Sequence, residues 1–188
     1  TLILLSVFLF CIFLLKALMP DAALIAAFTG TSSSAPASPS NPAPKGPFTA
    51  SKNLVRIGQL DPAQYNSNKD YNVWAYSACS TAAITEVLDA YGHHFRIADI
   101  LKVEAAIGEI TPQEGLLEDA GIAHTVAHFG FNTEWGHNRS LNDIINIANG
   151  GRPVIVSFPP DRYDGGHLVV VTGGNSQYVY LADSSIYN

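Results

Sequence analysis

Cysteine is scarce in this sequence, which holds only two cysteines among its 188 residues. Cys11 lies in an apolar N-terminal stretch, whereas Cys79 lies far away in a region with the mixed composition of a folded domain. Two thiols in such different settings are poor partners for each other, so a scaffold built on disulfides is excluded. Cys79 is left as a lone thiol, which is either a small buried apolar side chain or a reactive group.

Basic residues are also few, with 10 Lys and Arg against 16 Asp and Glu, a net charge of −6 and a pI of about 5.3. A protein that binds nucleic acid carries a basic face, but the basic residues here are scattered along the chain. The composition therefore argues against nucleic acid as a partner.

The N-terminal region lacks the polar residues that would give a core helix a solvent-facing side. Residues 2–15 are apolar except for Ser6, and a second apolar run covers residues 22–28. A core helix would show a polar face, so we predict that residues 1–30 are a hydrophobic signal or anchor segment. The clean run is shorter than the ~20 residues that span a bilayer, and alanines near its end offer small residues for signal cleavage. Two locations stay open: a single-pass membrane anchor with an extracytoplasmic domain, and secretion after cleavage.

The composition changes twice after this segment. Residues 31–47, with the sequence TSSSAPASPSNPAPKGP, are rich in Ser, Ala and Pro and show no hydrophobic periodicity. Such a composition predicts an extended linker. Residues 48–188 have the composition of a folded domain, and the sequence stops within a strand-and-turn pattern. We therefore expect a single domain that is truncated at its C-terminus.

Hydrophobic patterning within the domain predicts helices first and a sheet afterwards. We predict helices over residues 79–90, 97–107 and 140–148, a helix that starts at residues 111–114 and ends at Gly121, and a strand over residues 123–129. Strands follow at residues 153–158, 168–172 and 177–182, the last two joined by a hairpin turn at residues 173–176. This order is typical of an α+β fold, with a helical part packed on a C-terminal antiparallel sheet.

Cys79 stands at the predicted start of the first of these helices, with Ser77 as a candidate N-cap. The free N–H groups and the dipole at a helix start stabilise an anion, and a thiol in that place becomes a better nucleophile. Most residues around Cys79 are small or polar, which leaves room for a substrate. The position favours a reactive thiol over a buried apolar side chain.

A nucleophilic thiol needs a base within hydrogen-bonding reach. His167 follows two glycines and opens the strand 168–172, and Asp183 follows the strand 177–182. If these strands pair through the predicted turn, positions 167 and 183 are symmetric about its centre and lie opposite each other in the ladder. A carboxylate beside the imidazole would hold its tautomer and orientation. The spacing therefore predicts a hydrolytic site of Cys79, His167 and Asp183.

Three sequence blocks resemble the C39-like peptidase family: WAYSACSTAAITEVLDAYG, GRPVIVSFPPDRYDGGHLVVVTGG and YVYLADSS. The resemblance covers residues 48–188 and implies the papain-like cysteine proteinase fold. It implies that Cys79 is the nucleophile, that His167 is the general base and acid, and that Asp183 orients His167. It also implies a peptide or protein substrate, and neither a cofactor nor a metal.

The same resemblance implies a glutamine upstream of the nucleophile that helps to form the oxyanion hole. We assign this role to Gln64, with Asn72 as the alternative. The same site residues could serve a papain-like amidase or acyltransferase, and the same scaffold could be a non-catalytic binding module. These alternatives stay open beside the cysteine peptidase.

His124 and His128 are four residues apart, the spacing of two metal ligands on one face of a helix. They fall within the predicted strand over residues 123–129, where this spacing does not bring them to one helical face. We therefore do not predict a metal site.

Overall fold

The computed structural model describes residues 49–163 and 165–185. The predicted signal or anchor segment and the predicted linker lie outside these residues. Within the described part of the chain, no helix is both long and apolar enough to cross a membrane.

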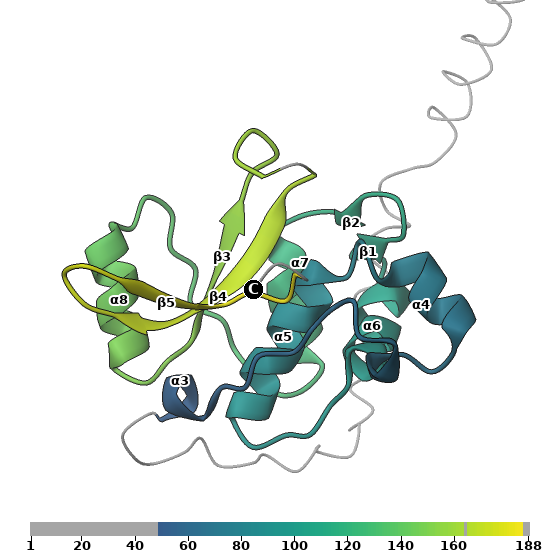
Figure 1. The fold of residues 1–188 in the computed structure, drawn as a ribbon, viewed down its shortest axis with the longest axis horizontal. Coiled ribbons are helices and arrows are strands. Elements are labelled where there is room, and N and C mark those ends of the chain that lie inside the picture. Colours follow the sequence, from purple (N-terminus) through teal and green to yellow (C-terminus); the bar gives the residue numbers. More distant parts are fainter. Residues whose placement is uncertain (1–48, 164, 186–188) are drawn as a thin grey trace, which may run out of the picture. The chain divides into compact units, whose positions relative to one another are not determined.

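Helices come first in the described chain and a three-stranded sheet closes it (Figure 1). The helices are α3 (Ala50–Asn53), the 3₁₀ turn η1 (Pro62–Gln64), α4 (Asn68–Trp74), α5 (Cys79–Ala90), α6 (Ile97–Ala106), α7 (Ala120–Ala127) and α8 (Leu141–Asn149). The strands are β1 (Ile110–Thr111), β2 (Gly115–Leu116), β3 (Val154–Phe158), β4 (His167–Gly174) and β5 (Val179–Ala182). The α+β class and the predicted places of α5, α6, α8 and the last three strands are confirmed.

The main sheet has the order β3-β4-β5 and is antiparallel throughout. Both α5 and α8 pack against the central strand β4, with α5 to the right and α8 to the left of it in Figure 1. Leu168 and Val170 of β4 lie in one buried cluster with Ala83 of α5 and Ala182 of β5. Because two helices cover it, β4 is buried over most of its length, and its first residue is fixed relative to α5.

Helix α5 is the centre of the helical layer. Nine of its 12 residues are buried, and it contacts α3, α6, α7 and β4. Its first turn carries two buried hydroxyls, Ser80 and Thr81, which both donate hydrogen bonds to the carboxyl group of Glu104 on α6. Burial raises the pKa of Glu104, and the two hydroxyl bonds oppose this effect. These bonds fix the start of α5, where Cys79 lies, against α6.

The predicted helix start at residues 111–114 is wrong, because a small hairpin of β1 and β2 occupies this region. The Thr111 hydroxyl does accept a hydrogen bond from the Glu114 N–H, as a helix cap would. The next residue, Gly115, has a φ of 68°, which a right-handed helix excludes. The capping interaction between Thr111 and Glu114 was therefore anticipated correctly, but the chain reverses direction after it and does not continue as a helix.

The predicted strand over residues 123–129 is also wrong, since α7 covers most of it. Ile122, Val126 and Phe129 pack inward together, and their spacing of four and three residues is helical. A short window of mixed residues fits both the strand and the helix period. His124 therefore lies on a helix after all, where its Nδ1 is 2.6 Å from a carboxylate oxygen of Glu109. Among the described residues, no group of three or more His, Cys, Asp and Glu could hold a metal ion.

Candidate active site

Cys79 is the first residue of α5 and its side chain is partly buried. The predicted cap is wrong: Ala78 occupies the N-cap position, and the Ser77 hydroxyl donates to the carbonyl of Trp74 at 3.1 Å instead. The N-cap residue makes no side-chain hydrogen bond to the helix. The first N–H groups of α5 are therefore left without the capping partner that would compete with an anion.

His167 is the first residue of β4 and is 5% exposed. Its Nε2 lies 2.7 Å from Oδ1 of Asp183, so the other ring nitrogen, Nδ1, is the one left for the thiol. A hydrogen bond with Cys79 raises the pKa of His167; burial opposes this, and the hydrogen bond and charge of Asp183 add to it. Cys79 and Asp183 therefore both act on the pKa of the same imidazole.

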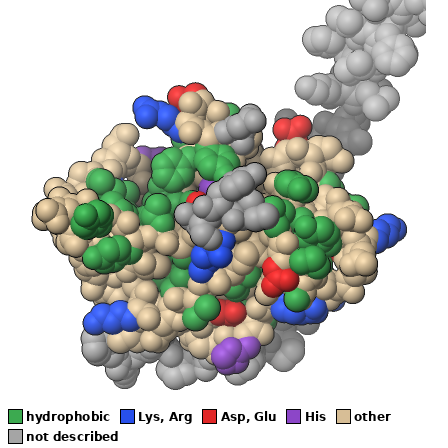
Figure 2. All heavy atoms as spheres, in the orientation of Figure 1, with side chains coloured by type: hydrophobic (Ala, Val, Ile, Leu, Met, Phe, Trp, Pro, Cys, Tyr) green, Lys and Arg blue, Asp and Glu red, His purple; other side chains and the backbone are tan. Residues whose placement is uncertain are grey.

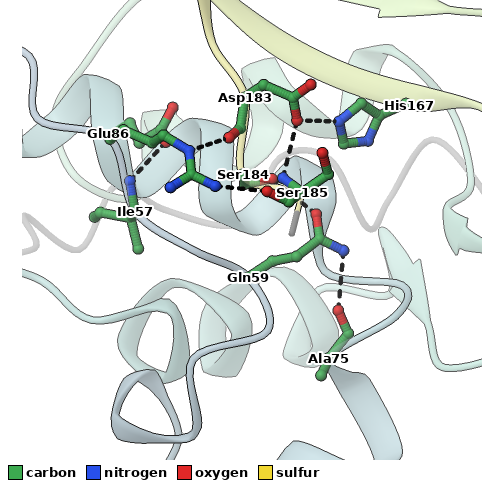
Figure 3. A network of polar contacts seen from close by, with 9 residues as sticks. Ile57, Gln59, Ala75, Glu86, His167, Asp183, Ser184 and Ser185 are labelled. Atoms are coloured by element: carbon green, nitrogen blue, oxygen red, sulfur yellow. Dashed lines mark hydrogen bonds and ion pairs between the residues drawn. The ribbon is translucent and has the colours of Figure 1, made fainter. Parts of the chain in front are cut away.

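The carboxylate of Asp183 is ionised in this arrangement. Burial alone would raise the pKa of Asp183, but hydrogen bonds from His167 and from the Ser185 N–H hold it below its ordinary value. Both bonds end on the same oxygen, Oδ1 (Figure 3). Because an ionised carboxylate only accepts hydrogen bonds, His167 must donate its Nε2–H to Asp183.

The predicted register of the last hairpin is wrong by two residues beside Asp183 and by three nearer the turn, although the contact between His167 and Asp183 is present. Ala182 pairs with Val170 and Leu181 with Val171, and an irregularity follows in β4 before the turn. The strand β4 runs on through Gly174, so the turn lies later than predicted. A shift of two residues leaves every side chain on its original face. Asp183 therefore reaches His167 diagonally, a separation that long side chains bridge.

Aromatic side chains adjoin this group. The ring of Tyr163 stacks on His167 with centroids 4.6 Å apart and an interplanar angle of 23°, and Phe158 pairs with His167 across the sheet. Tyr163 and Phe158 are 40% and 38% exposed, and Tyr76, three residues before Cys79, is 85% exposed. On the face shown in Figure 2, apolar side chains form several groups with Lys and Arg scattered among them. Partly exposed aromatic rings therefore border His167.

Among the described residues, the side chains of Gln64 and Asn72 make no hydrogen bond with Cys79, His167 or Asp183. Gln64 ends the turn η1, and its side-chain oxygen accepts a hydrogen bond of 3.3 Å from the Ile97 N–H at the start of α6. Asn72 lies on α4 and is exposed. The assignment of Gln64 to the oxyanion hole, with Asn72 as the alternative, was based on the family resemblance and on its place upstream of Cys79, and these contacts do not add to it.

Gln59 is the glutamine that adjoins the candidate site, and sequence reasoning missed it (Figure 3). Its side-chain oxygen accepts from the Ser184 hydroxyl at 2.7 Å, and its backbone N–H donates to the Ser184 carbonyl at 2.9 Å. Its Nε2 donates to the carbonyl of Ala75, four residues before Cys79, at 2.9 Å. Gln59 thus joins the segment that carries Asp183 to the loop that leads into α5. Its partners lie 125 and 16 residues away in sequence, so no local pattern marks it.

Glu86 is a second buried polar residue close to the site. It lies on α5, is 1% exposed and accepts a 2.8 Å hydrogen bond from the Ile57 N–H. Burial raises the pKa of Glu86 to about 7, while the Ile57 bond and the charge of Arg56 act in the opposite direction. The charge of Asp183 raises this pKa slightly further. Glu86 is therefore largely protonated in the folded protein below neutral pH.

This raised pKa predicts that the free energy of unfolding falls as the pH rises from about 4.5 to about 7. Over this range the unfolded chain ionises Glu86 and the folded chain does not, so ionisation favours unfolding. A shift of this size corresponds to at most about 3 kcal/mol. Glu86→Gln keeps an oxygen for the Ile57 N–H but does not titrate. Urea unfolding between pH 4.5 and 8 should show a smaller decline for this variant; parallel curves would contradict the prediction.

A cavity of about 480 Å³ lies between α5, α7, α8 and β3. Its lining includes Leu88, Val126, Ile147, Ile155 and Trp135, and it does not include Cys79 or His167. The candidate site and this cavity are therefore separate features of the described structure.

A thiol at a helix start, joined through an imidazole to a carboxylate, is the arrangement that activates cysteine nucleophiles. The comparison with protein families agrees with this class: residues 52–188 match the Peptidase_C39 like family. Since the match covers well over half of the chain, the chain belongs to this family. No curated protein and no solved structure matches the chain significantly.

Proposed function

We propose that this domain is a thiol-dependent hydrolase of the papain-like kind, and specifically a cysteine peptidase. The observation that carries the proposal is the grouping of Cys79, at the start of α5, with His167, whose pKa the thiol raises and whose Nε2 lies 2.7 Å from Oδ1 of Asp183. Membership of the Peptidase_C39 like family supports the same reaction class. The apolar N-terminal segment supports a location outside the cytoplasmic membrane, anchored or secreted.

In the proposed reaction, the sulfur of Cys79 attacks the carbonyl carbon of a peptide bond and forms a tetrahedral intermediate. His167 takes the thiol proton and gives it to the leaving nitrogen, so the C–N bond breaks and a thioester remains. Water then attacks the thioester while His167 accepts one of its protons and returns it to the sulfur. The products are a free acid and a regenerated thiol.

Two groups could stabilise the oxyanion formed in each step. The first is the backbone N–H at Cys79, which lies at the uncapped start of α5. The second is the side-chain amide of Gln59, which we propose in place of Gln64. Its nitrogen carries two hydrogens and uses one for the carbonyl of Ala75. Aromatic surface from Tyr163 and Phe158 beside His167 favours substrates with apolar side chains near the scissile bond.

The test is to incubate the full chain with a mixture of peptides of diverse sequence and to identify new chain ends by mass spectrometry. We expect cleavage at internal peptide bonds, enriched in apolar residues next to the cut. The Cys11→Ala variant is the matched control, because it removes the other thiol and should cleave as the unmodified chain does. Binding of peptides without any cleavage would favour a non-catalytic module, and release of side-chain or terminal ammonia alone would favour an amidase.

A further inference from the structure

Asp183 lies just beyond the end of the strand that precedes it. The last residue of β5 is Ala182, so the sheet's ladder does not include Asp183 or the two residues after it. The orientation of its carboxylate on His167 therefore depends on contacts from outside the sheet. The Ser185 N–H bond to Oδ1 is local and moves with the segment, so it cannot fix the segment's position.

Arg56 supplies contacts of the required kind. Its Nε donates to the Asp183 carbonyl and its Nη2 donates to the Ser185 carbonyl, so one planar guanidinium binds both ends of the segment. The two partners lie 127 and 129 residues away in sequence. Gln59 adds the bonds to Ser184 between them.

The segment that carries Arg56 is itself fixed to the helix of the nucleophile. The N–H of Ile57 donates to the buried carboxyl group of Glu86 on α5. Glu86 is seven residues after Cys79, which is two helical turns, so both lie on the same side of α5. A path of contacts thus runs from Glu86 on α5 through Ile57 and its chain neighbour Arg56 to Asp183, and on to His167.

We propose that Arg56 is a positioning residue that holds the backbone of Asp183 at a fixed place relative to α5, so that its carboxylate stays on His167. This role rests on the proposed function, in which Asp183 orients the catalytic imidazole. Arg56 acts through Asp183 and does not touch the reacting atoms. Its own charge is exposed, so its effect comes from the two backbone bonds.

The kinetic test is a double-mutant cycle of Arg56→Ala and Asp183→Ala in the full chain. We expect Arg56→Ala alone to lower kcat about tenfold and to leave KM unchanged, because Gln59 still holds part of the segment. In the Asp183→Ala background the same change should cost less than about twofold, since the group that Arg56 positions is gone. Arg56→Lys should rescue little, because a single ammonium does not reproduce the planar fork.

Arg96→Ala is the matched control, because Arg96 also binds a loop through a backbone carbonyl and a side chain, at Tyr65 and Asn66. It should leave kcat unchanged. If Arg56→Ala behaves like Arg96→Ala, or if its effect is the same with and without Asp183, the positioning role is overturned.

A second measurement does not depend on activity and therefore separates this inference from the proposed function. The pKa of His167 is followed by NMR titration of its imidazole. Removing the positive charge of Arg56 by itself would raise the pKa of His167, whereas displacement of Asp183 lowers it. We expect Arg56→Ala to lower this pKa in the direction that Asp183→Ala does. An unchanged or higher pKa would overturn the proposal, whether or not the protein cleaves peptides.

Discussion

Replacing Cys79 by alanine is expected to abolish peptide hydrolysis, with a fall in kcat/KM on the order of 10⁴-fold or more. Cys79 is the one thiol within the described residues, and the proposed reaction forms its covalent intermediate on that sulfur. The loss of one sulfur atom from a partly buried position leaves only a small void, so the variant should remain folded. Rates with a cleaved peptide identified from the mixture, together with circular dichroism spectra, measure both effects.

Cys79→Ser separates nucleophilicity from shape. Serine has a similar size, but its hydroxyl is a far weaker nucleophile than a thiol beside an imidazole. This variant should be folded, should still bind peptide and should be nearly inactive. Full activity of either variant would remove Cys79 from the mechanism and with it the proposed function.

Asp183→Asn is expected to lower kcat on the order of 100-fold or more while the fold is retained. The carboxylate accepts hydrogen bonds from His167 and Ser185 on one oxygen. The amide oxygen of asparagine can still accept such hydrogen bonds. The amide carries no charge, however, to stabilise the imidazolium that forms during the reaction. The pKa of His167 should fall in the same variant, because the hydrogen bond and charge of Asp183 both raise it. Steady-state kinetics and NMR titration provide the two readouts.

Asp161→Asn is a suitable control for this variant, since Asp161 lies on the loop before His167 and its side chain is 77% exposed. It removes a nearby carboxylate without touching the imidazole, and it should leave kcat and the pKa of His167 unchanged. Equal rates for Asp183→Asn and the unmodified protein would show that another group orients His167.

Helix α5 was predictable because its signals are local. Cys79 is followed by a long regular stretch with small residues at its start, and the structure begins α5 at that residue. Helix α8 was equally predictable, since Ser140 and Asp143 form a complete capping box at its start. In both places the residue pattern of one short stretch of sequence was enough to locate the helix.

The errors arose where partners distant in sequence decide the structure. The helix α7 has only eight residues, and its inward side is defined by neighbours in α5 and α6. The hairpin register was misplaced because Asn175 accepts hydrogen bonds from the N–H groups of Gln177 and Tyr178, which puts the turn later than the glycine pair suggests. The contact of His167 with Asp183 was nevertheless anticipated, because an error of two residues preserves the face.

The residues around the site were the hardest to find from the sequence. Gln59, Arg56 and Glu86 each make their informative contacts with partners at least 16 residues away. Gln64 was chosen for its place along the chain, but its side chain binds the start of α6. The segment that carries Arg56 and Gln59 contacts both α5 and the residues after β5. Its contribution to the site therefore becomes visible only when both elements are in place.

The most direct test of the central claim is to treat the full chain with a peptidyl vinyl sulfone and to identify the residue that it modifies. This electrophile reacts with an activated thiol when its peptide portion is bound nearby. Peptide mapping should locate the adduct on Cys79, and the adduct should be lost or strongly slowed in His167→Ala, which keeps the thiol but removes its base. An unmodified Cys79 in the folded protein, or equal labelling rates with and without His167, would contradict the assignment of a Cys79, His167 and Asp183 active site.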